Sequence, residues 1–190
     1  MSEKAKILFV DDEEAIRSLI LTVLEGDGHT AHGVGTAAEA MQAAGETAYD
    51  LVVIDKNLPD GSGIDLLREL KRKHPETEFM VLTGYPSLES AIEALRAGAF
   101  DYLIKPVLDL DLVTQKVSRA LERRRLLQQA YRSGDAPASG LDVRGSVQAL
   151  ARQAGALRAA VDGGKTVEAK ELAKAVDDAA QELVRRLGRG

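Results

Sequence analysis

Leu51-Val52-Val53-Ile54-Asp55 is a short apolar run that ends in a carboxylate, and three other apolar runs in the chain also end in a polar residue. Short, mostly continuous apolar runs that alternate with helical patterns are typical of buried strands in a parallel sheet. The other runs are residues 7–10 before Asp11-Asp12, 79–82 before Thr83, and 100–104 before Lys105. These runs predict an α/β chain built on a parallel sheet.

Helical patterns separate the runs, and a weaker strand is predicted at residues 30–34. Apolar residues recur at the spacing of a helix face in five segments: 13–25, 37–44, 64–73, 88–97, and 109 to about 131. Gly26-Asp27-Gly28 and Gly98 end two of these segments. The alternation predicts a doubly wound five-stranded parallel sheet with five helices.

Polar residues follow the predicted strands, and ligands of open α/β sheets bind at the carboxyl ends of the strands. Asp11, Asp12 and Asp55 would therefore meet the Thr83 hydroxyl and the Lys105 ammonium at one edge. This set suits a divalent cation and a phosphoryl group. Each residue alone has a simpler interpretation: a helix cap for Asp11 or Asp12, a turn for Asp55, a β-former for Thr83, or a solvated strand end for Lys105. All of these simpler roles together would be an unusual coincidence.

Composition limits the remaining classes of protein. The chain has 190 residues, no cysteine and a net charge of -5, which disfavours disulfide frameworks, thiolate metal sites and nucleic-acid binding through charge alone. No apolar run approaches the ~20 residues of a membrane span, and the first predicted strand begins too early for a signal peptide. We therefore expect a cytoplasmic protein without a membrane segment. His29, His32 and His74 show no ligand spacing, and surface positions are expected for them.

The motifs resemble those of response-regulator receiver domains, the flavodoxin-like phosphoacceptor domains of bacterial two-component systems. The resemblance covers about residues 5–125 and implies the sheet order 2-1-3-4-5. It is carried by Val10-Asp11-Asp12-Glu13, by Asp55-Lys56-Asn57-Leu58-Pro59-Asp60-Gly61-Ser62-Gly63, by Thr83-Gly84, and by Asp101-Tyr102-Leu103-Ile104-Lys105-Pro106.

The resemblance implies that Asp55 accepts a phosphoryl group from a phosphohistidine on a sensor histidine kinase, because a carboxylate can form an acyl phosphate. It implies a Mg²⁺ ion held by Asp12, Asp55 and the backbone carbonyl of Asn57. Asp11 would complete this metal site through a water or a hydrogen bond. No enzymatic output is expected beyond self-catalysed phosphoryl transfer and autodephosphorylation.

Further roles are implied for residues around the acceptor. Thr83 and Lys105 would each contact a phosphate oxygen, because charge neutralisation and positioning dominate phosphoryl transfer. Tyr102 would act as a rotameric switch that turns inward when Thr83 moves to the phosphate. A cis peptide is expected before Pro106, and Lys56 and Tyr85 would tune the lifetime of the phosphate.

Three segments are predicted: a receiver domain at 1–131, a linker at 132–140 and a helical hairpin at 141–190. Two series of apolar residues on either side of Gly163-Gly164 have coiled-coil-like spacing. They are Val143, Val147, Leu150, Ala154, Leu157 and Val161, and then Ala169, Leu172, Val176, Ala179, Leu183 and Leu187. This hairpin would form a homodimer or bind a helical partner.

Other outputs are less consistent with the sequence of residues 141–190. In a transcription regulator, residues 141–190 would be a short degenerate helix-turn-helix, but Asp177-Asp178 would face DNA phosphates unfavourably, so DNA binding is disfavoured. An enzymatic domain is disfavoured because the segment has no phosphate loop or metal cluster. A histidine-phosphotransfer bundle is excluded because residues 134–190 contain no histidine.

Overall fold

The computed structural model describes residues 4–85, 88–107 and 109–133. The predicted hairpin at 141–190, and the predicted linker from residue 134 on, lie outside the described residues. Among the helices that are described, none has the length and hydropathy needed to cross a bilayer.

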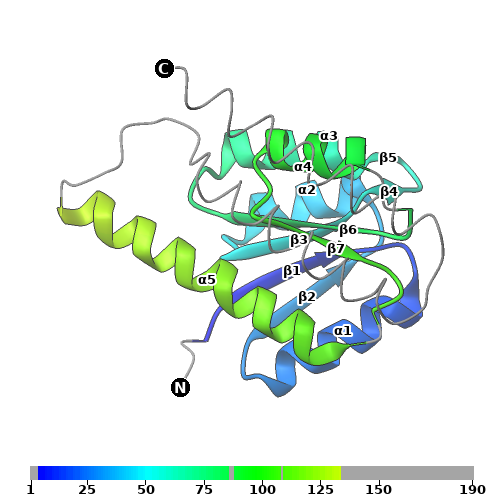
Figure 1. Cartoon of the computed structure of the whole chain (residues 1–190), viewed down its shortest axis with the longest axis horizontal. Coiled ribbons are helices and arrows are strands. Elements are labelled where there is room, and N and C mark those ends of the chain that lie inside the picture. The colour runs from blue at the N-terminus through cyan, green and yellow to red at the C-terminus, as the bar shows by residue number, and fades with distance from the viewer. Residues whose placement is uncertain (1–3, 86–87, 108, 134–190) are drawn as a thin grey trace. The chain divides into compact units, whose positions relative to one another are not determined.

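In the described part of the chain, five parallel strands form one sheet (Figure 1). Their order is β2-β1-β3-β6-β7, in which β6 and β7 are the predicted fourth and fifth strands, so the predicted fold and strand order are confirmed. The central strand, β3, pairs in parallel with β1 and β6, and its residue Leu51 lies opposite Ile7 of β1 and Glu78 of β6. The strands are β1 (Lys6–Val10), β2 (Thr30–Val34), β3 (Leu51–Asp55), β6 (Glu78–Thr83) and β7 (Asp101–Ile104).

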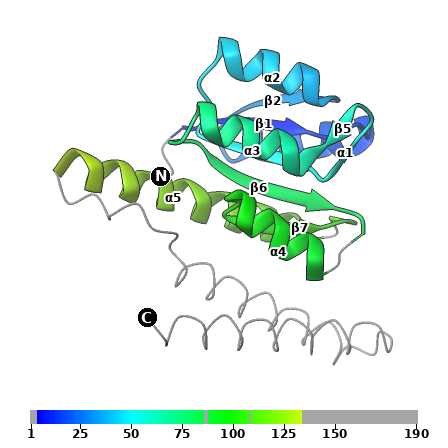
Figure 2. The ribbon, with the colours of Figure 1, turned by 90° about the horizontal axis from the view of Figure 1, so that it is seen from above.

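Five described helices cover the two faces of the sheet (Figures 1 and 2). Three of them lie on one face and two on the other, which gives each face its own apolar core. The first face carries α2 (Ala37–Glu46), α3 (Gly63–Lys73) and α4 (Leu88–Ala97); the second carries α1 (Glu14–Gly26) and α5 (Leu110–Ser133).

Side chains from alternate strand positions fill the two cores. Leu8 and Ile54 pack with Leu67 of α3 on the first face. Ile7 and Val53 face the opposite side, among residues that include Ile20 of α1 and Val117 of α5. Because both faces of each central strand are buried, the strands appear in the sequence as continuous apolar runs rather than as alternating ones.

The loop after β3 contains a small hairpin that the sequence pattern did not predict. Strands β4 (Asn57–Leu58) and β5 (Gly61–Ser62) pair antiparallel, and the Ser62 hydroxyl caps α3. Asp60, between the two strands, accepts hydrogen bonds from the backbone N–H groups of Ala37 (2.8 Å) and Ala38 (2.9 Å). Two-residue strands are too short to produce a periodic pattern, which explains why they were missed.

Helix α5 runs for 24 residues and ends at Ser133, two residues past the predicted end of the receiver segment. At 1.5 Å per residue it is about 36 Å long. Its first half packs on the sheet through Val113, Val117 and Ala120, and its C-terminal end extends beyond the strands (Figure 1).

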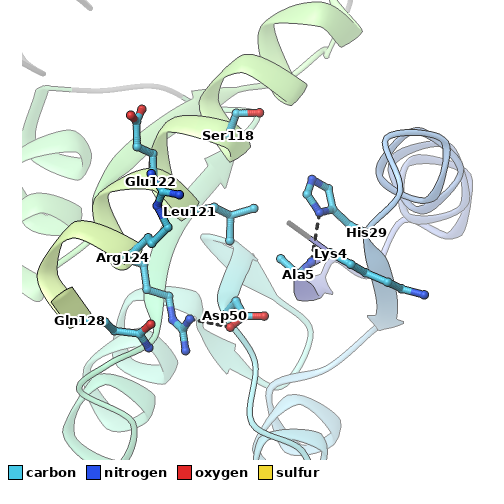
Figure 3. Close-up of a pocket in the computed structure, with 10 residues that line it drawn as sticks. Lys4, Ala5, His29, Asp50, Ser118, Leu121, Glu122, Arg124 and Gln128 are labelled. Carbon is cyan, nitrogen blue, oxygen red and sulfur yellow. Dashed lines mark hydrogen bonds and ion pairs between the residues drawn. The ribbon is translucent and has the colours of Figure 1, made fainter. Parts of the chain in front are cut away.

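The expectation that His29 lies at the surface is wrong. Its side chain is buried, and its Nδ1 accepts a hydrogen bond from the Ala5 N–H at 3.4 Å (Figure 3). His29 lies in the turn between α1 and β2. Its burial results from contacts with distant parts of the chain, which the local sequence pattern does not show. His32 remains exposed on β2 and forms a 2.6 Å hydrogen bond with the Tyr49 hydroxyl.

Candidate functional site

The carboxyl ends of four strands bring the predicted polar residues to one edge of the sheet. Asp55 is the last residue of β3, Thr83 is the last residue of β6, and Asp11 follows β1 directly. Lys105 follows β7, and its N–H donates to the Thr83 carbonyl at 2.7 Å. The sheet therefore holds the main chain of these residues in fixed register.

The Lys105 ammonium lies at the centre of the cluster. Its Nζ donates to Asp55 Oδ2 at 2.5 Å, to Glu13 Oε1 at 2.8 Å and to Asp11 Oδ1 at 3.1 Å. Burial by itself would lower the pKa of this ammonium, but the hydrogen bonds to Asp55, Glu13 and Asp11 outweigh burial and raise the pKa above its ordinary value. Lys105 therefore stays protonated at neutral pH.

Asp11 is fully buried, and its two oxygens differ in their partners. Oδ1 accepts from the Glu13 N–H at 3.0 Å as well as from Lys105. Oδ2 lies 2.9 Å from Lys105 Nζ, yet it is buried without a hydrogen bond of good geometry. Burial raises the pKa of this carboxyl, and the bonds from Lys105 and Glu13 only partly offset the effect. Asp11 thus presents an oxygen that a further ligand could satisfy.

A divalent cation fits this group of carboxylates. Among the described residues, Asp11, Asp12 and Asp55 each offer one oxygen, and these oxygens lie within 4.8 Å of one another. Glu13 is a fourth carboxylate at this site, and the Lys105 ammonium pairs with three of the four, Asp11, Glu13 and Asp55, so carboxylates outnumber the ammonium that they share. Hard oxygen donors of this kind are the ligands that Mg²⁺ prefers. The buried Oδ2 of Asp11 and the charge imbalance both favour a bound cation.

The β4–β5 hairpin is tied to the acceptor residue. The Asn57 N–H donates to Asp55 Oδ1 at 2.9 Å, so the start of the hairpin lies against the Asp55 carboxylate. A role for the Asn57 carbonyl as a metal ligand stays a prediction. Gly63 also contacts this region: a Cβ built there would lie 1.9 Å from the Asp55 carbonyl oxygen. No side chain fits at residue 63 unless Asp55 moves.

Thr83 and Tyr102 are both buried beneath the edge. The Thr83 hydroxyl accepts a hydrogen bond from the Tyr85 N–H at 3.2 Å, so its side chain is bound within its own loop in this structure. The peptide between Lys105 and Pro106 is cis, as the resemblance implied. The contact of Thr83 with a phosphate and the switch role of Tyr102 stay predictions.

Two residues that had no assigned role contact the site. Glu13 binds Lys105, and Arg17 donates from its guanidinium to the Asp11 carbonyl oxygen at 2.6 Å. The stem of Arg17 crosses β2 at Gly33, where a Cβ would lie 2.8 Å from Arg17 Cγ. Glu13 stands next to the Asp11-Asp12 pair in the motif, but its contact with Lys105 spans 92 residues, and only the fold reveals it.

The comparisons with known proteins agree with this geometry. The family model for the response regulator receiver domain matches residues 7–118. The response regulator protein PilR of Pseudomonas aeruginosa is 40% identical over 121 residues, which are 64% of this chain and 27% of that protein. The regulatory protein AtoC of Escherichia coli is 37% identical over 117 residues, 62% of this chain and 25% of that protein. The chain thus spans about a quarter of the length of these curated relatives.

Solved structures match the same part of the chain. A CheY-like receiver domain protein from Methanospirillum hungatei has a TM-score of 0.62 at 31% identity, covering 65% of this chain and 98% of that one. The beryllofluoride-activated NtrC4 receiver domain dimer has a TM-score of 0.60 at 30% identity, covering 63% of this chain and 98% of that one.

Proposed function

The chain belongs to the response regulator receiver domain family, and on that premise we propose that it is a phosphorylation-dependent signalling protein with Asp55 as its phosphoacceptor. The observation that carries the proposal is the position of the Asp55 carboxylate. It lies at the carboxyl edge of the sheet, bound to the Lys105 ammonium and within 4.8 Å of the Asp11 and Asp12 oxygens.

In the proposed reaction, an Asp55 oxygen attacks the phosphorus of a phosphohistidine on a sensor histidine kinase. The phosphorus–nitrogen bond breaks, the kinase imidazole keeps the electron pair and takes up a proton, and an acyl phosphate forms on Asp55. Lys105 would then pair with a phosphoryl oxygen, and Thr83 would donate its hydroxyl to another. In a separate autodephosphorylation step, water would attack the phosphorus of the acyl phosphate, the bond to the Asp55 oxygen would break, and inorganic phosphate would leave with the Asp55 carboxylate restored.

We propose Mg²⁺ as the cofactor, held by Asp11, Asp12, Asp55 and the carbonyl of Asn57. When bound, the ion would neutralise negative charge on the phosphoryl group and the carboxylates around it. The carboxylate cluster and the unsatisfied Asp11 Oδ2 support this assignment.

The proposed partners are the sensor kinase and a protein that receives the signal. We also propose a cytoplasmic location, as expected from the sequence. Residues 1–131 would be the receiver segment and 132–140 the linker, although the helix through Ser133 takes in the first two linker residues. Residues 141–190 would form the helical hairpin that dimerises or binds the output partner.

A transcriptional role is the second candidate, and the names of the relatives favour it. ZraR of Klebsiella oxytoca, 36% identical over 124 residues, is a transcriptional regulatory protein. That match covers 28% of ZraR. In this alternative, residues 141–190 would contact DNA through a degenerate helix-turn-helix. Binding of the full chain to genomic DNA fragments at low salt would favour it over a protein output.

The test of the main proposal is incorporation of a phosphoryl group from acetyl phosphate with Mg²⁺, measured by intact-protein mass spectrometry. Wild type should gain one phosphoryl group, and Asp55→Ala should gain none. Asp65→Asn, a change at an exposed carboxylate of α3, is the matched control and should behave as wild type. Equal incorporation by Asp55→Ala would refute the assignment.

A further inference from the structure

The Lys105 ammonium has three N–H donors, and each donor is in use. The acceptors are Asp11 Oδ1, Glu13 Oε1 and Asp55 Oδ2. An ammonium offers three donors and no acceptor. A phosphoryl oxygen can therefore bind Lys105 well only if one of the three present acceptors gives up its hydrogen bond.

The three acceptors differ in their freedom to move. The Asp11 side chain is completely buried and the Asp55 side chain is 7% exposed, whereas the Glu13 side chain is 56% exposed. Asp55 is also the residue that would carry the phosphoryl group. Only Glu13 can turn into solvent without leaving a buried charge unpaired, and an exposed ion pair contributes little stability that would hold it in place.

From this geometry we propose that the Glu13 carboxylate occupies, in the unphosphorylated protein, the place on Lys105 that a phosphoryl oxygen takes after transfer, and so competes with the phosphoryl group for Lys105. This inference rests on the proposed function. The Glu13 carboxylate supplies one anionic oxygen to Lys105, as a phosphoryl group would. Phosphorylation would have to break the ion pair between Glu13 and Lys105, and the lost electrostatic energy would make phosphorylation less favourable.

The backbone at Glu13 allows the side chain to be tested on its own. The Glu13 N–H is bound to Asp11 Oδ1, and its carbonyl accepts from the Arg17 N–H at 2.9 Å, so the main chain keeps its anchors when the side chain is changed. Glu14, the next residue, is also exposed and acidic, and it begins α1. Glu14→Gln therefore removes the same charge from almost the same place, which makes it a matched control.

The experiment compares beryllium fluoride binding by the full chain at saturating Mg²⁺ in wild type, Glu13→Gln, Glu13→Ala and Glu14→Gln, followed by amide NMR. Beryllium fluoride is the probe because it mimics a phosphoryl group on a carboxylate and reports an equilibrium. We expect both Glu13 variants to bind about two- to fivefold more tightly than Glu14→Gln, the range that a half-exposed ion pair supports. The difference should shrink at high salt, because screening weakens exposed charge pairs.

Two outcomes would overturn the inference. Glu13 variants that bind no more tightly than Glu14→Gln would show that Glu13 does not compete for Lys105. Weaker binding would show that Glu13 instead holds Lys105 ready for the phosphoryl group. Acetyl phosphate labelling of wild type separates this failure from that of the proposed function: wild type that takes no label on Asp55 overturns both, whereas labelled wild type with unimproved Glu13 variants overturns only the role of Glu13.

Discussion

The two edges of the sheet both hold buried charges, but they balance them differently. At the amino edge, formed by the amino ends of the strands, two carboxylates each have their own cation. Arg123 donates twice to Glu78, at 2.8 and 2.7 Å. Arg124 pairs with Asp50 at 2.6 Å (Figure 3). At the carboxyl edge one ammonium, Lys105, serves Asp11, Glu13 and Asp55.

This difference distinguishes a structural arrangement from a functional one. A buried carboxylate that has its own hydrogen-bonded cation is already paired, so it leaves no unbalanced charge for a further cation to neutralise. A cluster with more carboxylates than cations is costly until a cation joins it, which is the condition expected of a binding site. The amino edge should therefore matter for stability, and the carboxyl edge for ligand binding. The following changes test that division, from the largest expected effect to the smallest.

Gly63→Ala should break the carboxyl edge most severely. The added Cβ would lie 1.9 Å from the Asp55 carbonyl oxygen and 2.9 Å from Ile54 Cγ2, so the backbone of the acceptor residue must shift. We expect a loss of about 3 kcal/mol in unfolding free energy and at least a tenfold loss in labelling by acetyl phosphate. Gly45→Ala is the control, since nothing lies within 4 Å of its added Cβ. Equal urea midpoints for the two variants would contradict the packing argument.

Arg123→Met should destabilise the amino edge without impairing phosphoryl transfer to Asp55. It leaves the Glu78 side chain, 2% exposed, without the guanidinium that binds both of its oxygens. We expect a loss of about 2 kcal/mol in unfolding free energy, reduced from the fully buried case because Arg123 is partly exposed. Labelling of the folded variant at Asp55 should stay within twofold of wild type. A variant of unchanged stability that fails to take label would reverse the roles of the two edges.

Glu78, at the amino edge, should make the stability of the protein depend on pH. Burial raises the pKa of Glu78 above 4.5, although Arg123 and Lys71 oppose the rise. The folded protein therefore binds this proton more tightly than the unfolded chain. The resulting stability is present in full below pH 4.5 and is lost as pH rises through the folded-state pKa. Wild type should gain stability relative to Glu78→Gln as pH falls from neutral to 4.5, measured by urea unfolding. A constant difference would contradict the predicted rise in pKa.

Asp60→Ala should have the smallest effect, because the side chain is exposed. It removes the hydrogen bonds from Ala37 and Ala38 that join the β4–β5 hairpin to α2. These bonds also lower the pKa of Asp60, so the stability they supply should be lost as pH falls below 3.8. We expect Tm to fall by about 2 °C at neutral pH, and the difference from wild type to vanish in acid. A larger fall in labelling than in stability would show that the hairpin itself positions Asp55.

The sequence predicted the parts of the molecule that repeat a local pattern. The strand at 30–34 and the helix at 88–97 have the predicted bounds, because apolar spacing and turn residues mark them directly. The polar ends of the predicted strands also gave the residues of the candidate site, since parallel strands bring their carboxyl ends together. The roles assigned to these residues remain predictions for the experiments above.

The features that were missed depend on contacts between distant segments. Glu13 reaches Lys105 across 92 residues, and His29 is buried by its place beside Ala5, 24 residues earlier in the chain. The β4–β5 hairpin is too short to show a period. Charge excess at an edge is likewise a property of the assembled sheet, so the sequence could supply the acidic residues but not their sharing of a single ammonium.

A Mg²⁺ titration of the full chain, followed by amide NMR, tests the difference between the two edges most directly. We predict saturable shifts confined to the carboxyl edge, around Asp11, Asp12, Asp55 and Lys105, and their loss in Asp11→Asn. The amides of Asp50, Glu78 and Arg123 should stay unchanged. Shifts at the amino edge, or saturable binding that survives Asp11→Asn unaltered, would contradict the account that the excess of carboxylates around Lys105 is a cation site.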